Sequence, residues 1–330
     1  MKSNMSRGCW FLVGMLISTS GFAEEYDFEI GLAFNRTTFD GSQLITTPGG
    51  TIFSSSNTDM DELGVFGSWY FAGLSDDIGP RARAAFVDRA SSVGVGYSHL
   101  EQTISLFRSN DDPSFPVPPI DSVFDTDGDS LAVQIRYVDR DSGWFGNAGL
   151  LESNNMPFGP NGSIDDSSDA TGWNLGVGKY LFETTALSLD VSEVDGDGGL
   201  DTSVYALTFI HLGNFGERWQ YAIDVAYSRL DLDRSVDLDN WGATFALYPT
   251  RDFEFGINVE DVSADGRTFV DLDTTAIEGF ASWFVTPNVQ LSARYRVDDV
   301  SFFPDVTIGG APTVSDADQD SFGISATVRF

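Results

Sequence analysis

The sequence predicts an all-β protein, a transmembrane antiparallel β-barrel of about 14 strands, with 12 or 16 strands as the alternatives. Three observations lead to this fold class. Apolar and polar residues alternate with a period of two, in segments near the length that a tilted membrane strand needs. The apolar faces end in aromatic residues. The connections between segments are alternately short and long, which is typical of barrels with short periplasmic turns and long extracellular loops.

The first 23 residues have the order of a secretory signal peptide. Lys2 and Arg7 precede an apolar run, and the segment ends in the small-residue stretch around Ala23, after which we expect cleavage. The apolar run is too short for a spanning helix, which needs about 20 residues. We therefore expect two parts, a signal peptide at 1–23 and a barrel at 24–330.

Composition excludes several classes of protein. Cys9 is the only cysteine and lies in the signal peptide, so the mature chain can form neither a disulfide nor a thiolate metal site. Removing residues 1–23 takes away two of the 18 Lys and Arg and none of the 50 acids, which changes the net charge from −32 to −34. Nucleic acid is therefore not an expected partner, because its binding needs a basic surface. Aromatic residues make up 13% of the chain, which argues against disorder despite the charge.

The period-two alternation defines the expected strands. It is clearest in YDFEIGLAFN (26–35), DELGVFGSWYF (61–71), WQYAIDVAYS (219–228), FEFGINVE (253–260) and VQLSARYRVD (289–298). A soluble sandwich also alternates, so the aromatic residues at the ends of the apolar faces decide for a membrane barrel. The fourteen expected strands are 25–36, 59–72, part of 81–107, 129–139, 144–152, 171–182, 184–194, 200–211, 218–229, 238–248, 252–262, 273–285, 288–298 and 318–330.

The last ten residues, SFGISATVRF, continue this alternation to the final aromatic residue. We expect one face of this segment to contact lipid and the other to face the lumen. The lipid face carries Phe322, Ile324, Ala326, Val328 and Phe330. The segment is thus predicted to be the strand that closes the barrel.

These features resemble an outer-membrane porin of Gram-negative bacteria. The segments PRARAAFVDRASSVGVGYS (80–98) and WFVTPNVQLSARY (283–295) resemble the general porins of marine and other gammaproteobacteria. The resemblance implies a place in the cell outer membrane, contact with its lipid and lipopolysaccharide, and assembly as a homotrimer, with a monomer left open. It also implies that the barrel-assembly machinery reads the last strand, through Phe322, Ile324, Val328 and Phe330.

Charged residues on the polar faces of the expected strands should line a wet lumen, because a charge facing lipid at the bilayer midplane is destabilising by about 2–4 kcal/mol. The acidic candidates are Asp27, Glu29, Asp190, Asp224, Glu254, Glu260, Glu278 and Asp298. The basic candidates are Arg136, Arg218, Arg294, Arg296 and Arg329.

The loop at 153–170 is the candidate constriction, because the resemblance to general porins implies a third long loop folded into the barrel. In this interpretation Asp165, Asp166 and Asp169 face an arginine cluster such as Arg136, Arg294 and Arg296 across the pore. The alternative is an ordinary solvated surface loop.

No cofactor or specific metal site is expected. DTDGDS (125–130) and DVSEVDGDGGLD (190–201) are acidic, but neither has the bidentate acid that ends a calcium-binding loop. Weak divalent-cation binding in external loops, next to lipopolysaccharide, is the more modest expectation.

The predicted function is passive diffusion of ions and small hydrophilic solutes, with cation preference because acids dominate the wall. A channel specific for neutral or cationic solutes, a barrel enzyme and a purely structural barrel remain as alternatives. An enzyme is disfavoured because only His99 and His211 could serve as a catalytic histidine, and Ser98 and His99 fall on opposite faces of one strand.

Overall fold

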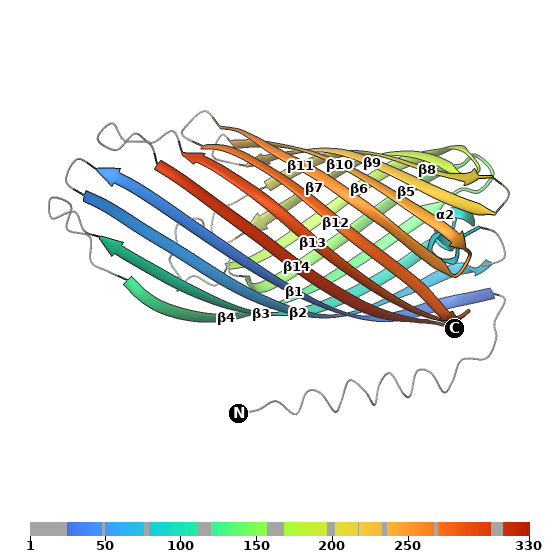
Figure 1. Ribbon diagram of the computed structural model, residues 1–330. Coiled ribbons are helices and arrows are strands. Elements are labelled where there is room, and N and C mark those ends of the chain that lie inside the picture. Colours follow the sequence, from blue (N-terminus) through green and yellow to red (C-terminus); the bar gives the residue numbers. More distant parts are fainter. Residues whose placement is uncertain are drawn as a thin grey trace, which may run out of the picture.

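The computed structural model describes residues 25–47, 50–75, 79–110, 120–156, 168–196, 202–216, 218–232, 236–266, 270–304 and 313–330. The predicted signal peptide at 1–23 lies outside these residues. The described chain folds into fourteen strands and one short helical segment (Figure 1). The strands are β1 (Glu25–Thr47), β2 (Gly50–Ser75), β3 (Ser92–Asn110), β4 (Ile120–Val138), β5 (Trp144–Met156), β6 (Ser168–Phe182), β7 (Thr185–Gly196), β8 (Thr202–Phe215), β9 (Trp219–Leu232), β10 (Val236–Thr250), β11 (Phe253–Gly266), β12 (Val270–Thr286), β13 (Val289–Pro304) and β14 (Thr313–Arg329).

These strands form one closed antiparallel barrel, which confirms the predicted fold class and strand number. Each strand pairs with its neighbours in sequence, and β1 pairs with β14 to close the ring. Closure leaves no unpaired strand edge, as a sheet in lipid requires. No helix in the described part of the chain is long and apolar enough to cross a membrane.

The two ends of the barrel differ in how the strands are connected. At one end, where the C-terminus lies, neighbouring strands are joined by turns such as 139–143 and 183–184 (Figure 1). We call this the turn end and the opposite end the loop end. At the loop end the strands run further than the alternation predicts; β1, for example, continues to Thr47 rather than ending near residue 36. The extra residues are mainly polar, and they continue the antiparallel pairing beyond the apolar part of each strand. Their composition therefore resembles that of a loop.

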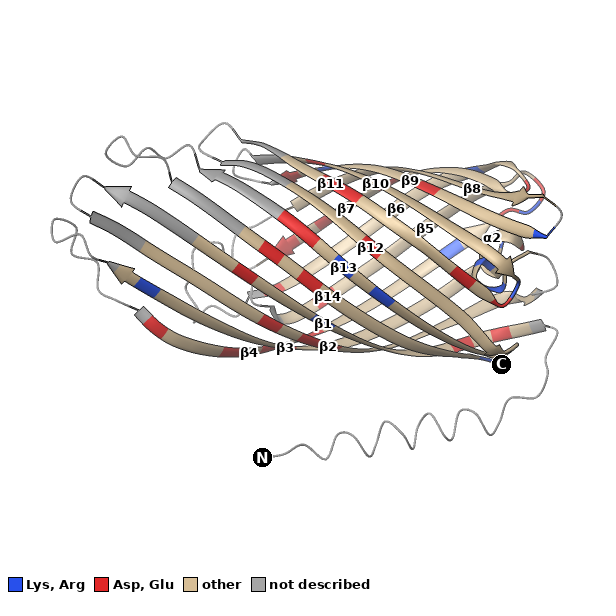
Figure 2. Cartoon of the chain, in the orientation of Figure 1, with Lys and Arg blue, Asp and Glu red and all other residues tan. Residues whose placement is uncertain are grey.

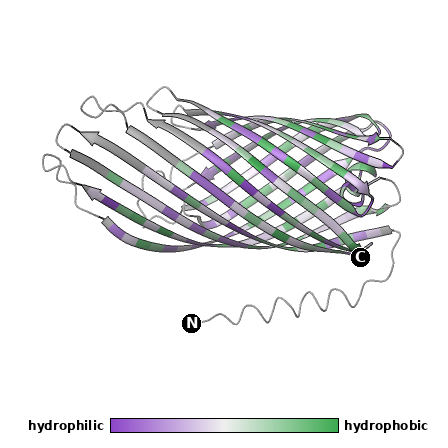
Figure 3. Ribbon diagram, in the orientation of Figure 1, coloured by the Kyte–Doolittle hydropathy of each residue, from purple (hydrophilic) through white to green (hydrophobic). Residues whose placement is uncertain are grey.

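Side chains alternate between the outer and inner faces of the wall, and Figure 3 shows apolar and hydrophilic residues alternating along the strands. On β6, for example, Trp173, Leu175 and Val177 all face outward and are 38%, 56% and 51% exposed. Large apolar side chains are exposed in this way on strands all around the barrel. A surface of this kind is expected of a wall that contacts lipid and not of a soluble domain.

The strand boundaries locate one expected strand and correct another prediction. The strand expected in part of 81–107 is β3, which begins at Ser92, and the residues before it form a 3₁₀ turn (Arg81–Arg83) and the helix α2 (Ala84–Val87). The acidic segment 125–130 was expected in an external loop, but it lies within β4. The acids of 125–130 alternate with small polar residues, so their pattern fits a polar strand as well as a loop.

Candidate functional site in the barrel lumen

The connection between β2 and β3 enters the barrel instead of forming a short turn. Residues 79–91, which we call the plug, include the 3₁₀ turn and α2. In Figure 1, α2 lies within the barrel near the turn end. The plug packs against inward-facing residues of β1 and β2, of β4 to β7, and of β8 to β10. These contacts on separate parts of the wall place the plug inside the ring of strands.

Apolar side chains of the plug pack against three clusters of buried residues. Ala85 packs against the cluster of Tyr26, Tyr70, Leu74 and Ala90 on the β1–β2 side. Phe86 packs against Val138, Phe145, Tyr180 and Ala186, which come from β4 to β7. Ala82, Phe86 and Val87 pack against Leu212, Ala222, Ala246 and Tyr248, from β8 to β10. The plug therefore has its own small core, which it shares with the inner wall.

Polar contacts fix the plug on the β9–β11 side of the wall. The Arg83 guanidinium donates to Asp224 Oδ2 at 2.6 Å and to the Tyr248 hydroxyl at 3.0 Å. Tyr248 in turn donates to Glu254 Oε1 at 2.6 Å. Burial alone would lower the pKa of Arg83, but the oxygens of Tyr248 and Asp224 outweigh this and raise it, so Arg83 stays charged. Arg81 also forms an ion pair with Asp252.

Two other parts of the wall also hold the plug, through Tyr180 on β6 and Arg329 on β14. The Tyr180 hydroxyl donates to the Phe86 carbonyl at 3.0 Å and accepts from Arg136 Nη2 at 3.2 Å. Arg329, on the last strand, donates to the Arg81 carbonyl at 3.2 Å. The plug is thus held by hydrogen bonds and ion pairs on several sides at once.

Most of the acidic residues predicted to line the pore occupy inward positions on the strands. They are Glu29, Asp190, Asp224, Glu254, Glu260, Glu278 and Asp298. Asp27 differs, because a register shift between Tyr26 and Phe28 places it at the turn-end rim, where it is exposed. The same shift turns Tyr26 inward, where it is only 4% exposed, although the alternation predicts that it faces lipid.

Four of the five predicted basic residues, Arg136, Arg294, Arg296 and Arg329, also occupy inward positions. The prediction for Arg218 is wrong: it lies in the turn between β8 and β9 and is exposed there. Arg218 comes directly before Trp219, the first residue of β9, so it lies one residue outside the strand. Acidic residues are spread along the whole wall (Figure 2).

The charged side chains of the inner wall fall into paired and unpaired groups. Arg296 bonds Glu260 at 2.7 Å and Asp298 at 2.8 Å, so this cation is shared by two acids. Arg329 lies 3.5 Å from Glu29. Among the described residues, Glu278 has no basic side chain within 4 Å, and Arg294 has no acidic one.

The predicted constriction loop at 153–170 lies mainly outside the described residues. Asp165 and Asp166 lie outside the described residues, and Asp169 is an exposed residue near the start of β6. Of the basic residues on the wall, Arg329 bonds the Arg81 carbonyl of the plug, and Arg136 bonds Tyr180, which itself contacts the plug. Among the described residues, no group of three or more His, Cys, Asp or Glu could hold a metal ion.

The plug is the functional feature that sequence reasoning missed. A signal for it exists in PRARAAFVDRA (80–90), where the alternation stops and Ala82, Phe86 and Val87 recur at helical spacing after a proline. Strand alternation resumes only after this stretch, at Ser92.

The fold can be compared with known proteins. No protein-family model matches the chain, and no curated protein sequence does. Among solved structures, the outer-membrane protein Omp33 of Acinetobacter baumannii aligns over 94% of this chain and 100% of its own, at 15% identity and a TM-score of 0.52. The chain shares the fold of an outer-membrane barrel. OccK7 (OpdD) of Pseudomonas aeruginosa aligns over 92% of the chain and 99% of its own, at 12% identity and a TM-score of 0.35. A BenF-like porin of Pseudomonas fluorescens Pf-5 covers 94% and 100%, at 11% identity and a TM-score of 0.35.

At this identity the likeness to Omp33 establishes the fold of the barrel and nothing finer. What the barrel does must therefore be inferred from its own wall and plug.

Proposed function

We propose that this protein is an outer-membrane porin that allows passive diffusion of ions and small hydrophilic solutes. The observation that carries the proposal is a closed 14-stranded barrel whose inner wall holds charged side chains at membrane depth. About eight strands already fill with their own side chains, whereas larger barrels enclose water. Charged residues on the inner wall need that water.

The plug occupies part of the lumen, so the proposed pathway has to pass it. It lies within the barrel at the turn end, which corresponds to the periplasmic side in this proposal. Solutes from outside would enter at the loop end, pass the polar wall and meet the plug last.

Cation preference is the second part of the proposal. Acidic side chains outnumber basic ones on the inward positions of the wall, and some of them, such as Glu278, have no cationic partner among the described residues. Acidic rings in a pore wall favour cations because they lower the energy of a cation passing nearby.

Location and partners follow from the same proposal. The chain would be exported, cleaved after Ala23, inserted by the barrel-assembly machinery and surrounded by lipid and lipopolysaccharide. Membership of the general porins and assembly as a homotrimer remain part of the proposal, with a monomer as the alternative. No nucleic acid and no cofactor are involved, apart from weak divalent-cation binding outside the membrane.

An enzymatic barrel is the less favoured alternative. His99 Nδ1 lies 2.9 Å from Asp129 Oδ1, but the Ser98 hydroxyl pairs with Ser130 at 2.8 Å on the opposite face. His211 contacts the Thr185 hydroxyl at 2.9 Å on the outer wall. Loss of a hydrolytic activity in His99→Ala or His211→Ala would support the enzyme and count against a simple pore.

Recordings in planar bilayers under a salt gradient test the proposal. We expect open channels with linear current–voltage behaviour and a reversal potential that reports cations as the more permeant ions. An anion-selective reversal potential would overturn the cation preference and leave the pore intact. A correctly folded barrel with no conductance would favour the structural barrel.

A further inference from the structure

We propose that the inner wall carries a binding subsite for a small organic carboxylate, built on Arg294. A recess of about 290 Å³ lies on the wall across β12, β13, β14, β1 and β2. This is near the lower end of the volumes of small-molecule pockets, about 300–1,000 Å³, so a compact solute fits it. This inference adds a ligand-binding subsite to the proposed porin function. It rests on that function only because solutes must be able to reach the lumen.

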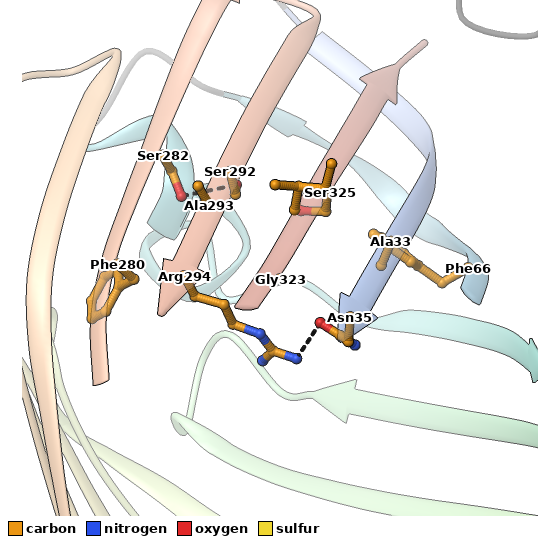
Figure 4. Close-up of a pocket in the computed structure, with 11 residues that line it drawn as sticks. Ala33, Asn35, Phe66, Phe280, Ser282, Ser292, Ala293, Arg294, Gly323 and Ser325 are labelled. Carbon is orange, nitrogen blue, oxygen red and sulfur yellow. Dashed lines mark hydrogen bonds between the residues drawn. The ribbon is translucent and has the colours of Figure 1, made fainter. Parts of the chain in front are cut away.

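Arg294 is held in one orientation at the rim of this recess. Its Nη2 donates to Asn35 Oδ1 at 2.8 Å, across the intervening strand β14 (Figure 4). Asn35 is fixed in turn, because its Nδ2 donates to Glu62 Oε2 at 3.0 Å. The guanidinium therefore does not have to be ordered when a solute arrives, which reduces the entropy cost of binding.

Gly323 makes this orientation feasible. The Arg294 side chain lies close against it, so that a Cβ at position 323 would be 2.7 Å from Arg294 Nε and 2.5 Å from Asn35 Oδ1. Both distances are too short for real contacts. Any larger residue at 323 would lift the guanidinium away from Asn35.

The charge of Arg294 is available to a ligand. Among the described residues, no carboxylate oxygen lies within 4 Å of its nitrogens, whereas the neighbouring Arg296 is bonded to both Glu260 and Asp298. The Asn35 amide separates Arg294 from the Glu62 carboxylate. Only one of the five N–H groups of Arg294 has a described partner, and the remaining ones can meet a carboxylate with two parallel hydrogen bonds.

The rest of the recess suits an apolar body attached to that carboxylate. Small residues form its floor, among them Ala33, Gly323 and Ser325. The rings of Phe280 and Phe66 flank it on either side (Figure 4). The hydroxyls of Ser282 and Ser292 are 2.9 Å apart and satisfy each other. A flat ring can therefore lie on the floor between the two aromatic rings while its carboxylate meets Arg294.

Phe280 places the recess next to the plug. It packs against the cluster that also receives Ala82 and Val87 of the plug. A solute bound at Arg294 would therefore lie next to the plug, on its loop-end side. Such a subsite would concentrate its solute beside the plug.

Calorimetric titration of the detergent-solubilised full barrel with benzoate tests the inference. Benzamide has the same ring without the charge, and acetate and inorganic phosphate have the charge without the ring. We expect saturable binding of benzoate and affinities lower by about tenfold or more for all three comparators. Benzamide loses hydrogen bonds to a charged group, which contribute about 1.5–3 kcal/mol. Acetate and phosphate lose the burial of the ring, which contributes a similar amount of about 1.5–3 kcal/mol. Equal binding of benzamide would overturn the role of Arg294. Equal binding of acetate or phosphate would overturn the role of the apolar recess.

Two variants locate the site. Arg294→Gln should weaken benzoate binding by about tenfold or more, because it removes the charged guanidinium. Gly323→Ala keeps the charge but displaces the guanidinium, so it should weaken binding several-fold. The matched control is Gly242→Ala, also on the inner wall, where a Cβ would meet only Glu260 Cγ at an ordinary 3.7 Å. Unchanged binding in Arg294→Gln, or equal losses in the two glycine variants, would overturn the proposal.

Folding is checked by heat-modifiable migration on gels, and the comparison of benzoate with benzamide needs only the wild-type protein. The outcome is separable from the proposed function. A barrel that conducts ions but does not bind benzoate would overturn this inference alone. A barrel that binds benzoate but does not conduct would overturn the proposed pore alone.

Discussion

The two ends of the lumen use the same residue types in different ways. At the turn end, arginines cross the lumen: Arg83 of the plug reaches Asp224 on the wall, and Arg329 on the wall reaches the plug carbonyl of Arg81. Nearer the loop end, charges stay along the wall, as in the pairing of Arg296 with Glu260 and Asp298. Charges that cross the lumen hold a segment in place, whereas charges that stay on the wall leave the lumen open to solutes.

Removing the plug should produce the largest effect. Replacing residues 77–90 by a short Gly-Ser turn leaves Ser91 in place, whose carbonyl accepts from Phe71 N–H at 3.0 Å. We expect the single-channel conductance in planar bilayers to rise several-fold, because no segment then crosses the turn end. Heat-modifiable migration confirms that the barrel closes. An unchanged conductance would show that the plug does not limit the ion path.

Deleting Phe330 should lower the yield of folded barrel several-fold while leaving the conductance of inserted channels unchanged. Its carbonyl accepts from the N–H groups of Asp27 and Phe28, at 2.9 and 3.3 Å, and its own N–H donates to the Phe28 carbonyl at 2.8 Å. These bonds close β14 onto β1 at the turn end. The measurement is the outer-membrane yield against the conductance per channel.

Phe330→Ala is the matched control for this deletion, because it keeps the three backbone bonds and removes only the ring. A loss as large as that of the deletion would assign the effect to the aromatic ring, as an assembly signal requires. A normal yield after the deletion would count against both the backbone and the signal role.

The barrel could be predicted from sequence because its strands repeat one pattern, with large apolar residues outward and mainly polar or small residues inward. Trp173, Leu175 and Val177 show it on a single strand. The plug could not be predicted in the same way, because its side chains bond to residues that are far away in the sequence. Nothing in the local pattern tells that Arg83 meets Asp224, 141 residues away.

The inner wall was predictable only in part for the same reason. Alternation places Arg294 and Arg296 on the same face, but it does not say that Arg296 is neutralised by Glu260 and Asp298 while Arg294 is not. That difference depends on the register between strands. A single register shift was also enough to turn Tyr26 inward against the expectation for its face.

Arg83→Ala should loosen the plug without removing it. The side chains of Arg83 and Asp224 are only 21% and 24% exposed, so truncation leaves a largely buried carboxylate unpaired. We expect amide hydrogen exchange in residues 80–90 to become about tenfold faster or more, which corresponds to about 1.4 kcal/mol of lost local stability. The control is Arg140→Ala, which breaks the more exposed pair with Asp88 at 3.3 Å and should change exchange little.

The single variant Asp224→Ala and the double variant with Arg83→Ala complete a double-mutant cycle. A coupling energy of about 0.5–3 kcal/mol is expected for two side chains in direct contact. A coupling near zero would mean that the apolar contacts of Phe86 and Val87 hold the plug without this ion pair.

The smallest effect concerns ion selectivity nearer the loop end. Glu278 has no basic side chain within 4 Å among the described residues, whereas Glu260 shares Arg296 with Asp298. Glu278→Gln should therefore reduce the permeability of cations relative to anions, measured as the reversal potential under a salt gradient. The change should be modest, since two charges 4 Å apart in water interact by only about 1 kcal/mol. Glu260→Gln removes the same charge but leaves Arg296 paired with Asp298, so it should shift the reversal potential less. If Glu260→Gln has the larger effect, pairing along the wall does not decide which acids a passing ion meets.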